Sequence, residues 1–140
     1  MDPYGSFNFK VEIDGIIRAA FREASGLDST IDVIEYREGG DLTPRKLPGM
    51  VRYSNISLTN GVTDDTQLYD WHRQWATGDP AAQRKSGSIV LLDRQGQEKL
   101  RWDFRDAWPV SWKGPSFGAE SSDLAIESFE LAHQGVKLSK

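Results

Sequence analysis

The chain has 140 residues, and 17 lysines and arginines stand against 21 aspartates and glutamates, which gives a formal net charge of -4. This length predicts a single domain over residues 1–140, and the negative balance argues against a protein that binds the phosphate backbone of nucleic acids over a broad face. The absence of cysteine excludes disulfides, thiolate nucleophiles and zinc–thiolate sites, and the absence of any run of about 18 apolar residues excludes a membrane-spanning helix.

The first predicted element is a β-hairpin. Between Ser6 and Ile13, apolar and polar residues alternate, which is the pattern of a strand with one buried face. Asp14-Gly15 follows, and this pair favours a two-residue turn in which both central residues have positive φ. We expect the return strand to cover Ile16 to Ala24.

Two further strands are predicted in the next part of the chain. After a turn over residues 25–30, the run from Ile31 to Glu38 reads as a third strand. A fourth runs from Met50 to Leu58 and closes at Asn60-Gly61.

The segment between these strands, residues 39–49, is rich in Gly and Pro. Neither of its prolines can donate a hydrogen bond to a β-ladder, so we predict a projecting loop. Its basic residues Arg45 and Lys46 are either solvated or used in contacts between subunits, because long loops on small β domains commonly carry such contacts.

One helix is predicted. It begins near Thr63-Asp64-Asp65, where a hydroxyl and two acidic side chains favour the positive end of the helix dipole. Gly78 and Pro80 end it. The residues that share its apolar face, at spacings of three and four, are Leu68, Trp71 and Trp75.

Strands resume after the helix. Residues 88–92 and 98–106 form a predicted hairpin, and residues 108–112 extend it with an interruption at Pro109. The periodicity of residues 124–133 fits either a strand or a helix. Because strands outnumber helices, the predicted class is a mainly β sandwich or barrel with one helix.

The sequence contains no recognisable motif of a catalytic, metal-binding or cofactor-binding site. His72 and His133 are the only histidines, and neither has the spacing of a metal-binding pair. Asp64 and Asp65 could act as acid and base, but helix capping explains them. Lys85-Ser86-Gly87 lacks the glycine that precedes the lysine of a phosphate-binding loop. We therefore predict no catalytic residues, no metal and no cofactor, and a protein that is not an enzyme.

The five tryptophans suggest a rival hypothesis, since β-sandwich modules that bind sugars stack aromatic faces on the sugar rings. The predicted helix face and strand alternation instead assign Trp71, Trp75 and Trp102 to the core. Trp108 and Trp112 flank Pro109, at what could be an edge or an interface. A carbohydrate-binding module that uses these two residues therefore stays open.

A resemblance to a known family adds to this interpretation. The turn Ser25-Gly26-Leu27-Asp28 and the strand that ends in the paired glycines Gly39-Gly40 resemble the tail tube family of contractile phages and extracellular contractile injection systems. The resemblance continues through residues 55–62, 68–71 and 129–133, and it depends on their order and spacing. It implies two packed antiparallel β-sheets flanked by one α-helix, as in phage tail tubes and type VI secretion ring proteins, and it favours a strand for the final segment.

The resemblance also implies a function and partners. Six copies would close into a ring whose inner strands form one barrel, and rings would stack into the inner tube of a contractile phage tail or injection system. Sheath contraction would propel this tube, and baseplate and cap proteins would bind its ends. A baseplate-proximal paralogue that initiates the tube and a type VI secretion ring protein are the related alternatives.

Two sets of contact residues follow from the resemblance. The projecting loop would reach the adjoining ring or a neighbouring subunit, and its proposed contact residues are Asp41, Leu42, Arg45, Lys46 and Leu47. Polar strand positions are candidates for the lumen or for intersubunit contacts, and these are Lys10, Glu12, Arg18, Arg22, Glu35 and Arg37.

One departure from the family bears on the cargo. Phage members often carry a basic pair before the glycine that closes the strand at Leu58, whereas this chain has Thr59-Asn60-Gly61. This favours an injection system, with protein effectors rather than DNA as cargo. The first residues lack the regions of a signal peptide. We therefore expect assembly in the bacterial cytoplasm, no membrane insertion, and release of the particle by lysis.

Overall fold

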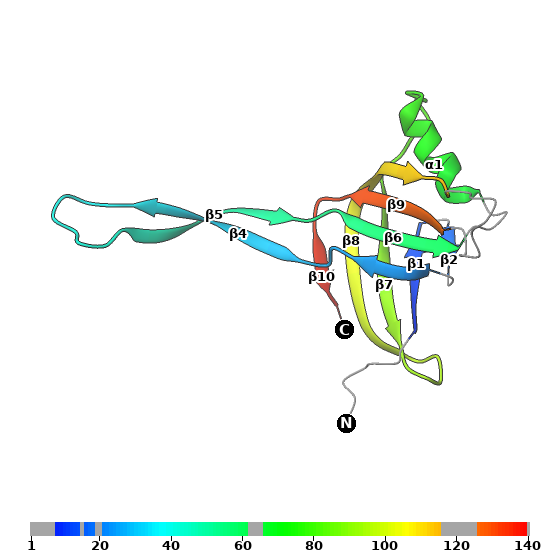
Figure 1. Cartoon of the computed structure of the whole chain (residues 1–140), viewed down its shortest axis with the longest axis horizontal. Coiled ribbons are helices and arrows are strands. Elements are labelled where there is room, and N and C mark those ends of the chain that lie inside the picture. Colours follow the sequence, from blue (N-terminus) through cyan, green and yellow to red (C-terminus); the bar gives the residue numbers. More distant parts are fainter. Residues whose placement is uncertain (1–7, 15, 19–20, 62–65, 116–125, 140) are drawn as a thin grey trace, which may run out of the picture.

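The computed structural model describes residues 8–14, 16–18, 21–61, 66–115 and 126–139. A β-rich body carries one helix near one end, and a long two-stranded arm projects from it (Figure 1). The elements are β1 (Asn8–Ile13), β2 (Ile16–Arg18), β3 (Phe21–Ser25), β4 (Ser29–Tyr36), β5 (Arg45–Tyr53), β6 (Ile56–Gly61), α1 (Gln67–Ala76), β7 (Lys85–Leu92), β8 (Glu98–Lys113), β9 (Ile126–Ala132) and β10 (Val136–Leu138).

The body is an antiparallel sheet with the strand order β2-β1-β7-β8-β9-β6-β3, and β10 pairs with β8. β8 has 16 residues. Its first part pairs with β7 and β10 and its second part with β9, so it belongs to two half-sheets. We call β2, β1, β7, the first part of β8 and β10 the first half-sheet. The second half-sheet is the last part of β8 with β9, β6 and β3.

The two half-sheets share one hydrophobic core. Large side chains of the first half-sheet meet those of the second, among them Val11, Ile89, Phe104, Ile56, Leu58, Phe129 and Leu131. A buried side chain of this size stabilises the fold by about 1.5–3 kcal/mol relative to exposure. The predicted class, packed antiparallel β-sheets with one helix, is confirmed, and the two sheets are parts of one bent sheet.

Helix α1 packs through the predicted apolar face. Leu68 and Trp71 are buried, and the Trp71 indole N–H donates to the carbonyl oxygen of Gln83 at 2.9 Å. The helix ends at Ala76, and Gly78 follows with a φ of 71°, which a residue without Cβ adopts at little cost. The predicted start at residues 63–65 lies outside the described residues.

The return strand predicted over residues 16–24 is in fact two strands. β2 pairs with β1, with Ile13 opposite Ile16, whereas β3 pairs with β6 at the far edge of the sheet. The sequence pattern alternates through both strands, and local periodicity does not reveal that the chain changes partner between them.

The loop predicted over residues 39–49 is wrong from Arg45 onward, because β5 begins there and the fourth strand divides at residues 54–55 into β5 and β6. Pro48 is tolerated because β4 and β5 pair only with each other in the described part of the chain, so each has an open edge where no N–H is needed. The register also shifts between Ile31 and Val33, a bulge that lies next to this proline.

The last part of the chain follows the prediction more closely. The interruption expected at Pro109 is a register shift within β8, and the strand continues to Lys113. The final segment is a strand, β9, as the resemblance favoured.

Candidate functional site

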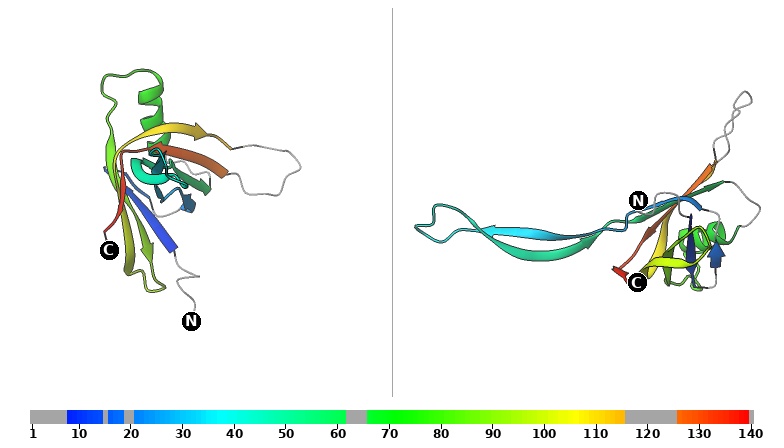
Figure 2. Two further views of the ribbon diagram at one scale, coloured as in Figure 1. Left: turned by 90° about the vertical axis from the view of Figure 1, so that its left-hand side faces the viewer. Right: turned by 90° about the horizontal axis from the view of Figure 1, so that it is seen from below.

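The arm is the most prominent feature outside the body. Strands β4 and β5 form their own two-stranded sheet, which extends away from the other strands in Figure 1 and in the right-hand view of Figure 2. An isolated two-stranded hairpin is marginally stable in water. The arm therefore needs contacts that the described body does not provide.

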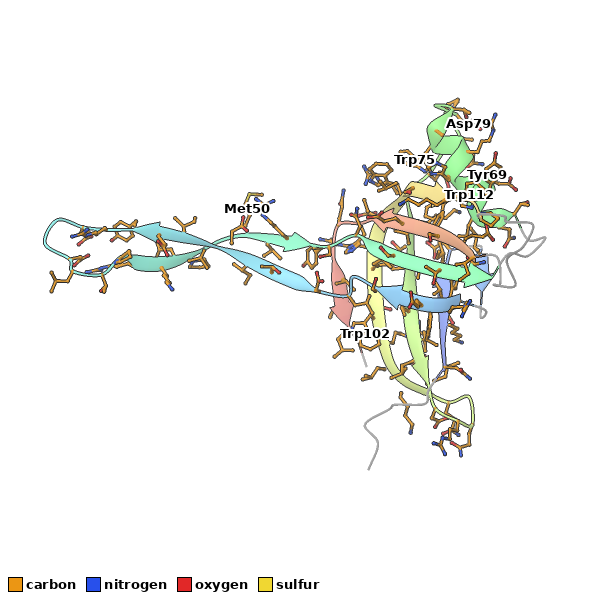
Figure 3. The ribbon with its side chains drawn as sticks, in the orientation of Figure 1. Met50, Tyr69, Trp75, Asp79, Trp102 and Trp112 are labelled. Carbon is orange, nitrogen blue, oxygen red and sulfur yellow. The ribbon has the colours of Figure 1, made fainter. Side chains whose placement is uncertain are left out.

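The arm carries most of the large hydrophobic side chains that are exposed in the described residues. Of the twelve large hydrophobic residues exposed in the described chain, nine lie between residues 31 and 53. They are Ile31, Val33, Ile34, Tyr36, Leu42, Leu47, Met50, Val51 and Tyr53, and Figure 3 shows side chains along the arm, with Met50 labelled near its middle. A concentration of apolar side chains of this kind marks a protein interaction surface.

The tip of the arm is held by polar contacts around Asp41. Arg37 Nε donates to the Asp41 carbonyl oxygen at 2.8 Å, and Arg45 Nε lies 3.3 Å from Asp41 Oδ2. The Tyr36 hydroxyl donates to Glu38 Oε1 at 2.8 Å, which raises the pKa of the tyrosine. Beyond these contacts Leu42 is 95% exposed. Asp41 and Arg45 thus shape the tip, and Leu42 is the apolar group that it presents.

The root of the arm is fixed to the body. Gly26 has a φ of 94°, and a Cβ there would lie 2.0 Å from the Asn55 carbonyl oxygen. His133 Nε2 lies 2.9 Å from the Ser54 carbonyl oxygen, and the Gly135 N–H donates to His133 Nδ1 at 3.1 Å. These partners assign the neutral tautomer with the proton on Nε2. His133, for which the sequence indicated no metal site, thus ties Ser54 at the end of the arm to the body.

The second half-sheet is open at both of its edges within the described residues. At one edge, β3 pairs only with β6. At the other edge, the pairing of β7 with β8 ends at Lys85 and Ala107, so the last part of β8 pairs only with β9. Unpaired strand edges are templates for pairing with another chain.

One face of the second half-sheet carries two rows of mainly hydroxyl side chains. Directly opposed residues on neighbouring strands share a face, so the register defines the rows. The first row is Ser25, Ser57, Glu130 and Ser111, and the second is Glu23, Thr59, Ser128 and Lys113. We call this surface the hydroxyl face. Sequence reasoning missed it because it considered only charged positions, although Ser57 and Thr59 alternate with buried residues.

The opposite face is covered by the helix. Trp71 lies 6.1 Å from Phe129 between ring centroids, and Tyr69 lies 4.7 Å from Trp112. The indole of Trp112 also donates to Glu127 Oε2 at 3.1 Å. The two faces therefore differ: one is apolar and covered, the other polar and open.

The structure places the predicted lumen or interface residues in three separate regions. Lys10 and Glu12 lie on β1, Arg22 is exposed on β3, and Glu35 and Arg37 belong to the arm and its tip. Arg18 lies on β2 opposite Val11, and its side chain is outside the described part of the chain. Of these residues, Arg22 alone shares a strand with the hydroxyl face.

Lys10 and Glu12 belong to an ion network of the first half-sheet. Glu12 lies 3.0 Å from Lys10 Nζ and 3.1 Å from Arg101 Nη1, while Arg101 also binds Glu98 at 2.7 Å. The hydrogen bond from Lys10, and then that from Arg101, lower the pKa of Glu12. These charges compensate one another within the subunit.

The tryptophans do not form an exposed aromatic platform. Trp71 is buried as predicted, while Trp75 and Trp112 are partly buried against the core. Trp108 and Trp75 lie 5.7 Å apart between ring centroids. Trp102 is half-buried. The packing of Trp108 and Trp112 removes the support for a sugar-binding surface at these residues.

The described residues contain neither a metal-binding cluster nor a membrane-spanning helix. No group of three or more His, Asp or Glu side chains is arranged to hold a metal ion within this part of the chain. No helix in it is long and apolar enough to cross a membrane.

Comparisons with known proteins agree with this geometry. The family model for the T4-like virus tail tube protein gp19 matches residues 5–137. A chain of the PVC sheath-tube complex of an extracellular contractile injection system, in the extended state, is 31% identical, with a TM-score of 0.83 over 98% of this chain and 91% of that chain. A chain of the anti-feeding prophage baseplate is 26% identical, with a TM-score of 0.85 over 99% and 96%.

A chain of the anti-feeding prophage cap is 29% identical, with a TM-score of 0.84 over 99% of this chain and 92% of that chain. A type six secretion system protein is 12% identical, with a TM-score of 0.61 over 95% and 83%, and at this identity the likeness shows the fold alone. No curated protein sequence matches the chain.

Proposed function

This chain belongs to the T4-like virus tail tube protein family and is a structural tube subunit, and we propose that six copies close into a ring and that the rings stack into a hollow conduit. The second half-sheet carries this proposal, because neither of its edge strands has a second partner strand among the described residues. When head-to-tail contacts between copies close into a ring by rotation, each edge strand pairs with the edge strand of the next copy.

The strand directions suit this closure. β8, β9, β6 and β3 are antiparallel from one neighbour to the next, so β3 runs opposite to β8. The β8 of the next copy can therefore pair with β3 and continue the antiparallel pattern around the ring. The contact repeats without a change of register or direction.

The channel would be lined by the hydroxyl face. A closed barrel has an inside and an outside, and the face that carries α1 and the first half-sheet is too bulky for the inside. No described element of the chain covers the hydroxyl face, and five of its eight residues are Ser or Thr. Such a surface would offer cargo hydrogen bonds but little apolar area to which it could adhere.

Protein effectors are the cargo that this surface supports best. The two rows contain the acids Glu23 and Glu130 and the base Lys113, so they lack the cationic surface that would retain the phosphates of DNA. The absence of a basic pair before Gly61 also favours protein cargo over DNA.

The family places the chain in phage tails or tail-like particles. We propose a sheath around the tube and baseplate and cap proteins at its ends, since relatives were solved in those three assemblies. Sheath contraction would drive the tube outward. We expect the particle to assemble in the bacterial cytoplasm and to leave by lysis.

The arm would make the contact with the adjoining ring. Its exposed apolar residues and its projecting tip support this role, with Asp41, Leu42, Arg45, Lys46 and Leu47 as the contact residues. A structural subunit of this kind needs no catalytic group. A baseplate-proximal initiator would share the fold and would differ in having one ring for each particle.

Hydrogen exchange measured by mass spectrometry tests the ring. Amides of residues 21–25 and 110–113 should exchange faster in the monomer than in assembled particles, whose form negative-stain microscopy establishes. Assembled particles in which both edges exchange as in the monomer would contradict edge pairing. A protein that stays monomeric at high concentration, even with its assembly nucleus present, would contradict the tube itself.

A further inference from the structure

The two open edges of the second half-sheet each carry a β-bulge. In β3 the extra residue is Arg22, which lies at the register shift against β6. In β8 the extra residue is Val110, at the register shift against β9. The inner pair of this half-sheet, β6 with β9, runs without a shift. Because a bulge bends its strand and disrupts the ladder, each one limits the length of edge that another strand can join.

The regular part of each edge lies beyond its bulge and ends with its strand. It covers residues 23–25 in β3 and residues 111–113 in β8, and we call these the β3 segment and the β8 segment. The two segments have equal length, and their directions allow antiparallel pairing between copies. Pro109, which has no N–H to donate, adds to the limit on β8. An incoming strand therefore meets a short, defined stretch at either edge.

Each segment carries one charged side chain, and the two charges have opposite sign. Glu23 and Lys113 stand at the two ends of the second row of the hydroxyl face, and both are exposed. Neither forms an ion pair with another residue of the described ranges. Arg22 stands outside the β3 segment, in the bulge. The β3 segment is thus acidic, and the β8 segment is basic.

The shared face limits how the two segments can pair. Residues directly opposite each other point to the same face, so residues of the hydroxyl face must meet residues of the hydroxyl face. In the direct register, Glu23 is opposite the Lys113 side chain of the next copy. A shift by two residues, which the strand tilt of a closed barrel can require, makes the same side chains diagonal neighbours. Unlike charges are therefore adjacent whenever β3 meets β8.

The same edges could also pair with their own kind. A two-fold contact would join β3 to the β3 of another copy, or β8 to another β8, and it would give closed dimers in place of rings. The first contact brings two Glu23 carboxylates together, and the second brings two Lys113 ammonium groups together. Like charges on neighbouring strands destabilise the pair. Head-to-tail contact is the arrangement in which these charges attract.

We propose that Glu23 and Lys113 select the partner strand when the ring closes. The two side chains form an ion pair between neighbouring copies on the channel wall, and the same charges disfavour two-fold dimers. This inference rests on the proposed function, and it adds the residues that determine which edges meet. Charges across an interface commonly act in this way, since they set specificity more than affinity.

Charge reversal tests the proposal. Glu23→Lys and Lys113→Glu each place like charges at the head-to-tail contact. Each variant alone should therefore need about threefold more protein than wild type, or more, to assemble at low salt. The double variant Glu23→Lys, Lys113→Glu restores unlike charges and should recover assembly. Sedimentation measures the assembled fraction, and circular dichroism confirms that each variant is folded.

A mixture of the two single variants gives a sharper result. The β3 edge of Glu23→Lys meets the β8 edge of Lys113→Glu with unlike charges, and the reverse contact is also between unlike charges. An equimolar mixture should therefore assemble at concentrations at which neither variant assembles alone. With one variant isotope-labelled, mass spectrometry of the sedimented particles should give equal amounts of both.

Glu130→Lys is the matched control, because it reverses the same charge on the same face but on the inner strand β9. It should assemble as wild type does. High salt should reduce the defect of the single variants, since it screens exposed charges. The neutral variant Glu23→Gln, Lys113→Gln should show a larger fraction of dimers in analytical ultracentrifugation than the double reversal does.

Two results would overturn the proposal. One is assembly of both single variants at the wild-type concentration, and the other is failure of both the double reversal and the mixture. Wild-type particles whose edges are protected from hydrogen exchange, found together with either result, would leave the ring itself standing. Wild-type particles with unprotected edges would instead contradict edge pairing, on which this inference depends.

Discussion

Arg101 and Glu12 are 89 positions apart in the sequence, yet their side chains lie 3.1 Å apart across the first half-sheet. Both strands pair with β7, where Lys10 and Arg101 flank Val90, which has no exposed surface. The ion network of Lys10, Glu12 and Arg101 thus lies on the same face of this half-sheet as Val90 and flanks that buried side chain.

The pKa of Glu12 is lowered, first by the hydrogen bond from Lys10 and then by that from Arg101. A carboxylate with a depressed pKa stabilises the folded state above its ordinary value of 4.5, and this stabilisation disappears as the pH falls through the folded-state value. Glu12→Gln should therefore lower the free energy of unfolding at pH 7 by about 0.5–1 kcal/mol. Urea titrations at several pH values should show the difference from wild type shrinking below pH 4.5, whereas a constant difference would contradict this assignment.

Gly26 and Gly40 offer a matched pair of glycines with nearly equal φ values, 94° and 93°. A Cβ at Gly26 would collide with the Asn55 carbonyl oxygen, whereas a Cβ at Gly40 meets nothing within 4 Å. Gly40→Ala should cost about 1 kcal/mol from the backbone conformation alone. Gly26→Ala should cost clearly more and displace the arm, and denaturant unfolding measures both. Equal losses would show that the close approach at the root has no effect.

Trp71 and Trp75 both donate to the Gln83 carbonyl oxygen, at 2.9 Å and 3.3 Å, but only Trp71 is buried. Trp71→Phe loses the stronger hydrogen bond and leaves a cavity under the helix, so we expect a loss of about 2–3 kcal/mol. Trp75→Phe should cost less than half of that. Thermal unfolding followed by circular dichroism distinguishes the two variants, and the reverse order would contradict the packing of α1.

Leu42 at the tip should contribute to stacking and not to folding, since it is 95% exposed in the single chain. Burial of a leucine side chain at a contact contributes about 1.5–3 kcal/mol. Leu42→Ser should therefore raise the concentration needed for tube growth by roughly tenfold or more. Leu42→Met, which keeps the apolar volume, is the control, and sedimentation of tubes is the measurement. Unchanged growth of Leu42→Ser tubes would remove the tip from the contact.

Ser57 is exposed in the first row of the hydroxyl face. Ser57→Lys adds one positive charge for each subunit, so tubes of this variant should retain nucleic acid, which wild-type tubes release. The ratio of absorbance at 260 and 280 nm after nuclease treatment measures the retained fraction. Ser57→Gln is the neutral control. Equal ratios in tubes of both variants would show that Ser57 does not face the channel.

The sequence by itself determined the local elements whose pattern is set by nearest neighbours. The β1–β2 turn and the helix face at Leu68 and Trp71 follow from alternation and turn chemistry, and these depend on residues only a few positions apart. The resemblance in the order of segments then indicated the family, which the comparisons confirmed.

Only the tertiary structure decided which strands pair and which faces remain open. The change of partner between β2 and β3, the strand through Pro48, and the hydroxyl rows each depend on residues that are distant in the chain. A proline is acceptable in a strand only if that edge is unpaired, and a serine faces a channel only if no element covers it. Both conditions are properties of the assembled sheet, so no local pattern in the sequence records them.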